Sequence, residues 1–135
     1  MRLRLRRPAS ERGSSSLELA LLAPGLLLLT LLIVQTAFWF HARQVAQAAV
    51  EQGARATRAY QGTEDRGRRV TTDYFGRLGG PKVTEAPPNV NASRGATNVT
   101  VTLTTTSVKV IPFWSWPVVV RAGGPIEQFQ PPAGP

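Results

Sequence analysis

The chain has 135 residues, a formal net charge of +8 and no cysteine. This length suits one small domain and an anchor, and the lack of cysteine excludes disulfides, thiolate nucleophiles and cysteine-ligated metal sites. Five arginines and one acid precede an apolar run: Arg2, Arg4, Arg6, Arg7, Arg12 and Glu11. A basic flank of this kind is typical of the cytoplasmic end of a membrane span, so no nucleic-acid partner is expected.

The apolar run extends from Leu19 to Phe40 without a charged residue, and only Thr30, Gln35 and Thr36 interrupt it. About 20 residues of helix cross a bilayer core. We therefore predict a basic leader over residues 1–13, then a transmembrane helix over 14–40. The N-terminus is expected in the cytoplasm and the C-terminal domain outside it.

Two alternatives to this processed, single-pass arrangement stay open. Ala46-Gln47-Ala48 offers a small-x-small site at which signal peptidase would release a secreted soluble domain. The chain would otherwise remain an unprocessed single-pass anchor that presents an extracytoplasmic binding domain.

An acid, Glu18, stands at the entrance of the apolar run, five residues after Gly13. This arrangement resembles the processing site of type IV pilin-like proteins. The resemblance implies that a prepilin peptidase cuts between Gly13 and Ser14 and removes residues 1–13. Ser14 and Glu18 are i and i+4, so the new α-ammonium and the carboxylate share one helix face. Alternatively, Glu18 only marks the headgroup level, where its charge suits the helix N-terminus.

Residues 12–60 resemble TadE-like pseudopilins of the tight-adherence (Flp) system. The shared pattern ends in Ala42-Arg43, Ala48-Ala49 and Gly53-Ala54-Arg55. The resemblance implies a role in assembling a Tad/Flp-type pilus or related secretion apparatus. The implied partners are the membrane, prepilin peptidase, other pilin-like subunits and the Tad secretion machinery. Leu19 stands where the major pilin commonly has an aromatic residue, which favours a minor pseudopilin.

Pro24 lies early in the span, as in pilin helices of this family, where a bend could ease transfer from lipid into a filament. An ordinary membrane-helix proline is the alternative.

After Phe40 the apolar pattern continues at helical spacing, which predicts an amphipathic stalk helix over residues 41–62. Its alanine-rich stripe contains Ala42, Val45, Ala46, Ala49, Gly53, Ala56 and Tyr60. Small residues let helices approach closely, so the stripe is a candidate contact with neighbouring subunits. It could equally cover the chain's own C-terminal domain, and the two interpretations can coexist.

Residues 63–130 are predicted to form a small α+β outer domain, with residues 131–135 as a disordered tail. We expect a helix over 64–78 that Gly79-Gly80-Pro81 stops. The alternation of valine or leucine with threonine over 99–104 predicts a strand, with a bulge or turn near 104–107. A short buried run at 118–120 completes an expected antiparallel sheet of about three strands.

Phe113, Trp114 and Trp116 lie between two prolines, Pro112 and Pro117. This segment is either a tip that touches a partner or the membrane, or the core plug of a small domain. The single histidine, His41, fits an interfacial position better than a catalytic base. The sequence contains no catalytic or phosphate-binding motif, so we expect neither an enzyme nor a cofactor or metal site.

Overall fold

In the computed structural model of the chain, residues 11–126 are described. Most of the predicted leader and all of the predicted tail lie outside them. The elements run in the order α1 (Glu11–Arg58), α2 (Glu64–Arg77), α3 (Gly80–Val83), β1 (Asn89–Arg94), β2 (Asn98–Thr106) and β3 (Pro117–Pro125). The strands pair antiparallel in the order β1-β2-β3. This confirms the predicted α+β fold with a long N-terminal helix, a second helix and three antiparallel strands.

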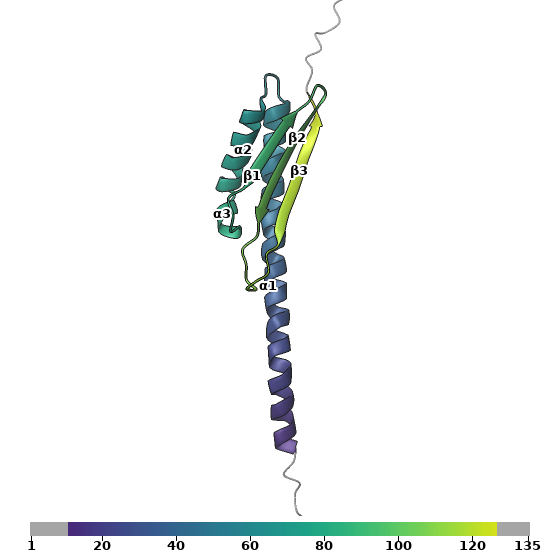
Figure 1. The fold of residues 1–135 in the computed structure, drawn as a ribbon, viewed down its shortest axis with the longest axis vertical. Coiled ribbons are helices and arrows are strands. Elements are labelled where there is room, and N and C mark those ends of the chain that lie inside the picture. The colour runs from purple at the N-terminus through teal and green to yellow at the C-terminus, as the bar shows by residue number, and fades with distance from the viewer. Residues whose placement is uncertain (1–10, 127–135) are drawn as a thin grey trace, which may run out of the picture.

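Helix α1 is continuous over 48 residues, or about 70 Å at 1.5 Å per residue. Figure 1 shows that the sheet, α2 and α3 pack along its C-terminal half, while its N-terminal half projects alone. The two threonines of the apolar run fit this helix because each hydroxyl donates to the carbonyl four residues earlier. Thr30 bonds Leu26 at 2.9 Å and Thr36 bonds Leu32 at 2.8 Å.

The turn between α1 and α2 follows from local chemistry. Helix α1 ends at Arg58, and Gln61, with a left-handed φ of 60°, lies in the turn that follows. Thr63 is the N-cap of α2, and its side chain accepts a hydrogen bond from the Arg66 N–H at 3.2 Å. The helix ends at Arg77, close to the predicted Leu78. The Gly-Gly-Pro segment does not stop all helical structure, because Pro81 in the first turn of α3 starts one further turn.

Strand β2 differs from the sequence prediction near its end. Of the bulge or turn expected at 104–107, the bulge is absent: β2 runs regularly to Thr106, where the strand ends, and the inward positions continue through Thr105 and Ser107. These hydroxyls are tolerated inside because both have partners. Thr105 donates to the Ala86 carbonyl at 2.8 Å, and the Ser107 hydroxyl accepts from Gln35 at 3.4 Å.

Strand β3 also corrects a prediction. Val118 and Val120 are buried, but Val119 is 53% exposed, so 118–120 is not a continuous buried run. The reason is that the helices cover only one face of the sheet, and side chains alternate between its two faces. The core lies between that face and the C-terminal half of α1.

Candidate functional site

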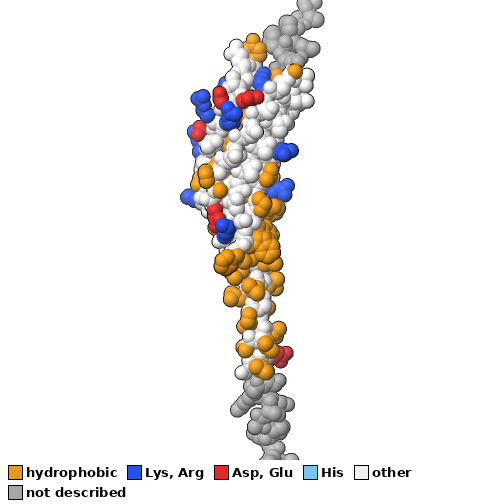
Figure 2. Space-filling model, viewed as in Figure 1, with side chains coloured by type: hydrophobic (Ala, Val, Ile, Leu, Met, Phe, Trp, Pro, Cys, Tyr) orange, Lys and Arg blue, Asp and Glu red, His pale blue; other side chains and the backbone are white. Residues whose placement is uncertain are grey.

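The projecting half of α1 is the most unusual surface of the described chain. Figure 2 shows hydrophobic side chains gathered along it below the outer domain. They include Leu17, Leu19, Leu21, Leu22, Leu26, Leu27, Leu28, Leu29, Leu32, Ile33 and Val34, all exposed. The helix is long and apolar enough to cross a membrane, and none of its most apolar window is buried. Such a surface needs an apolar environment, either lipid or neighbouring helices.

The predicted processing residues lie at the start of this helix. The Gly13–Ser14 bond falls within the first turn of α1, and Glu18 is exposed one turn further along. A peptidase would therefore need to open only the first turn, and helix ends open more readily than helix interiors. Because α1 is continuous here, a new N-terminus at Ser14 would lie on the same helix as the Glu18 carboxylate.

Pro24 lies inside α1, in the same projecting half, and is exposed. It has no N–H, so the carbonyl of Ala20 loses its usual helical donor. The helix nevertheless runs through this position, and Pro24 marks the point where it is easiest to bend.

Most of the alanine stripe is buried inside the chain, whereas a contact with a neighbouring subunit would require exposed residues. Ala42, Ala46 and Ala49 have no exposed surface, and Gly53 is buried with them. All four pack within the chain, against the outer domain. These four residues support the interpretation in which the stripe covers the chain's own domain, and in this fold they are not accessible to a neighbouring subunit, whereas Tyr60 at the end of the stripe is 71% exposed.

The close approach of α1 and α2 depends on a reciprocal glycine–threonine contact that the sequence analysis missed. A Cβ at Gly53 would lie 1.8 Å from the Thr71 hydroxyl, and a Cβ at Gly67 would lie 2.0 Å from the Thr57 hydroxyl. Each threonine also donates to the carbonyl four residues before it, at 2.8 Å. The sequence pattern that could have indicated this contact is G-x-x-x-T, which occurs once in α1 (Gly53 to Thr57) and once in α2 (Gly67 to Thr71).

Gln35 is a second residue whose role the sequence did not reveal. It lies within the apolar run yet is fully buried. Its side-chain amide donates to the Val108 carbonyl at 3.0 Å, and its oxygen accepts from the N–H groups of Val110 at 2.7 Å and Ile111 at 3.3 Å. One α1 side chain therefore holds a loop more than seventy residues away in sequence.

That loop, residues 107–117, is called here the tryptophan loop. The Trp39 indole N–H donates to the Pro117 carbonyl at 3.1 Å, and the Trp39 and Trp116 rings pack edge to face at 6.1 Å. Trp114 lies 6.2 Å from Trp116 and is 57% exposed. Phe113 is fully exposed at the tip. The structure thus combines the two interpretations of this segment: Trp116 packs against α1, and the other two rings form an exposed tip.

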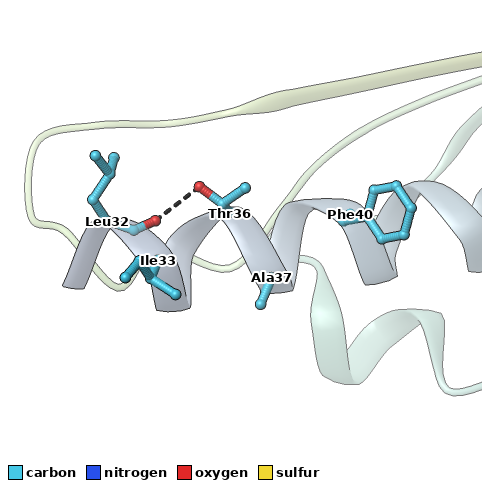
Figure 3. A pocket seen from close by; sticks show the side chains of 5 residues that line it. All are labelled: Leu32, Ile33, Thr36, Ala37 and Phe40. Atoms are coloured by element: carbon cyan, nitrogen blue, oxygen red, sulfur yellow. Dashed lines mark hydrogen bonds between the residues drawn. The ribbon is translucent and has the colours of Figure 1, made fainter. Parts of the chain in front are cut away.

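Shallow apolar depressions lie on α1, each lined only by residues of that helix. Figure 3 shows one lined by Leu32, Ile33, Thr36, Ala37 and Phe40. Its one hydroxyl, on Thr36, already donates to the Leu32 carbonyl. A second depression is lined by Ile33, Val34, Ala37, Phe38 and His41. Both surfaces suit hydrocarbon better than a polar ligand.

The described residues therefore define a small α+β domain carried on a single helix that is able to span a membrane. The family model described as TadE-like protein matches residues 13–55. The N-terminal helix is therefore similar to that family over these residues, which confirms the resemblance predicted from the sequence. The match begins at Gly13 and ends within α1, so α2 and the sheet lie beyond it. Searches of the curated proteins and of the solved structures each found no match.

Proposed function

We propose that this chain is a minor pseudopilin that contributes to the assembly of a Tad/Flp-type pilus or related secretion apparatus. It acts by helix packing and not by catalysis. The observation that carries the proposal is the TadE-like match, which begins at Gly13 and covers the projecting half of α1 from there on. That half is apolar and uncovered by the rest of the described chain, as a segment that exchanges lipid for neighbouring helices would be.

In this proposal prepilin peptidase removes residues 1–13 and leaves Ser14 as the mature N-terminus. The leader arginines hold that end in the cytoplasm, and the outer domain lies on the other side of the membrane. Release as a soluble domain fits the structure less well. A cut after Ala48 would divide α1 and detach the buried residues Gln35, Ala42 and Ala46 from the domain they pack against.

The assembly contacts are assigned to the projecting half of α1, because the alanine stripe is already used inside the chain. Glu18 is the single acid of that half beyond Ser14. An unpaired carboxylate costs about 2.5–3.5 kcal/mol at mid-bilayer and less near the interface. Pairing with the Ser14 α-ammonium, in the same subunit or a neighbour, would offset that cost as the helix enters an assembly.

Replacing Glu18 by Gln tests this proposal, since it keeps size and hydrogen bonding but removes the charge. Glu18→Gln should be cut and inserted normally but recovered poorly with the other pilin-like subunits of the apparatus. The matched control is Glu51→Gln, which removes an exposed acid of α1 that accepts a hydrogen bond from Gln47 on the same helix at 3.1 Å. Recovery of Glu18→Gln equal to that of the control would contradict the charge-pairing role. Failure of the parent chain to co-purify with any pilin-like subunit would contradict the proposed function.

A further inference from the structure

We propose that the tryptophan loop lies in the outer interface of the same bilayer that α1 crosses, with Phe113 and Trp114 in contact with lipid. The inference rests on the membrane anchoring contained in the proposed function. The loop would give the protein a second point of contact with the bilayer, besides α1, and would fix the depth and tilt of the outer domain.

The first argument is the position of the loop along α1. Its attachment residues, Gln35 and Trp39, both lie inside the apolar run that ends at Phe40. Gln35 precedes Phe40 by about 7–8 Å along the helix axis at 1.5 Å per residue. If lipid covers α1 as far as Phe40, the loop enters the membrane with it.

The alternative register gives nearly the same result. Counting back about 20 residues from the Gln35 attachment, a bilayer core would be crossed by residues 15–34, the part of α1 that the outer domain leaves uncovered. The core would then end where the loop begins. The loop therefore lies at the level of the interface in this register and just inside it in the first, close to where tryptophan side chains prefer to settle.

The second argument is the chemistry of the tip. Phe113 is 104% exposed and adopts a φ of 70°, which bulky residues rarely adopt. Packing within the described chain therefore does not hold its ring. Pro112, Phe113 and Trp114 are apolar, and the one charged residue of the loop, Lys109, pairs with Glu85 at 2.9 Å. Such a tip gains by leaving water for lipid.

The third argument is that the backbone of the attached part of the loop, residues 107–111, has hydrogen-bond acceptors within the protein. Backbone polar groups that enter a membrane need partners within the protein. Six loop N–H groups have an acceptor, those of Ser107, Val108, Lys109, Val110, Ile111 and Trp114, whereas those of Phe113, Ser115 and Trp116 have none within the described part of the chain. Pro112 and Pro117 carry no N–H at all. Gln35 supplies two of these acceptor contacts from inside the apolar run, which explains why a buried amide is placed there.

The position of Arg43 favours lipid over a protein partner. Its guanidinium lies over the Trp39 ring, 5.6 Å from the centroid. It is one helical turn beyond the tryptophan, at the level where lipid phosphates would follow an interfacial aromatic ring. The loop itself carries no acid, so nothing in it repels an anionic headgroup.

Site-directed spin labelling tests the inference on the full chain. Because the protein has no cysteine, a single one can be introduced and labelled. We choose Phe113→Cys and Ser115→Cys in the exposed tip, Leu28→Cys in the projecting helix, and Thr72→Cys on the exposed surface of α2. Each labelled protein is reconstituted into phosphatidylcholine–phosphatidylglycerol vesicles. Collision rates with oxygen, which concentrates in lipid, and with a water-soluble nickel chelate are then measured.

The expected result is an oxygen-to-nickel ratio at residues 113 and 115 several-fold higher than at residue 72, and lower than at residue 28. A ratio at both tip positions equal to that at residue 72 would overturn the inference while leaving the anchor intact. Low collision rates with both reagents would mean that protein covers the tip, which also overturns it. An aqueous ratio at residue 28 would show that α1 is not inserted, and the membrane anchoring would fail as well.

Discussion

Replacing Gly53 by Ala tests whether the reciprocal glycine–threonine contact holds the outer domain on α1. The added methyl would lie 1.8 Å from the Thr71 hydroxyl and 3.0 Å from the Gly67 carbonyl, whereas ordinary contacts begin near 3.4 Å. Thr71 can turn away only by giving up its 2.8 Å hydrogen bond to Gly67. The backbone carbonyl has no such freedom, so the two helices must also move apart.

The magnitude follows from three effects. Overpacking a tight core costs about 1–3 kcal/mol. A buried hydroxyl left without its partner costs about 1–3 kcal/mol more. Alanine in a helix gains about 1 kcal/mol over glycine. Gly53→Ala should therefore destabilise the domain by about 1–5 kcal/mol, despite its better helix propensity.

The assay is thermal unfolding of the full chain in detergent, followed by near-ultraviolet circular dichroism of the packed tryptophans. Gly76→Ala is the matched control, because a Cβ there meets nothing within 4 Å in the same pair of helices. It should unfold at the parental temperature or above. Adding Thr71→Ala to Gly53→Ala should recover part of the loss through coupling between the two sites. If Gly53→Ala unfolds at or above the temperature of Gly76→Ala, the close-contact reasoning is refuted.

Three further predictions concern the loop, its ion pair and the topology. Gln35→Leu should leave two loop N–H groups without acceptors and cost about 1–3 kcal/mol, and unchanged hydrogen exchange at Val110 would contradict this. The hydrogen bond from the Lys109 side chain lowers the pKa of Glu85, so the pair stabilises the fold above the unfolded-state pKa of that carboxyl and loses this contribution as pH falls through the lower folded-state pKa. Lys109→Met should therefore unfold below the parental temperature at neutral pH and approach it in acid, and a pH-independent difference would count against the pair. A topology reporter fused after Pro135 should be active only outside the cytoplasm, and cytoplasmic activity would reverse the proposed orientation.

Much of the fold could be predicted because it rests on local patterns. The apolar run and the 3.6-residue period that continues it produce one helix, α1. Thr63 before two acids gives the start of α2, and the alternation from Val99 to Leu103 gives the centre of β2. In each case the decisive neighbours are only a few residues apart, so the sequence contains the necessary information.

The features that could not be predicted depend on distant partners. Gln35 resembles a polar interruption of a membrane helix until residues 107–111 are placed beside it. Thr105 and Ser107 belong on the solvent side by polarity alone, but hydrogen bonds allow them inside. Small residues such as Ala46 predict a close helix contact without indicating which chain supplies the other surface.

The most direct test of the central claim is the N-terminal sequence of the mature protein, isolated from membranes of cells that contain the cognate prepilin peptidase. The proposed pseudopilin begins at Ser14, and replacing Gly13 by a bulky residue such as leucine should leave the precursor uncut. A mature chain that begins at Met1 or Arg2 would identify an unprocessed anchor, and one that begins at Ala49 would identify a secreted domain. Either of these results would contradict the account.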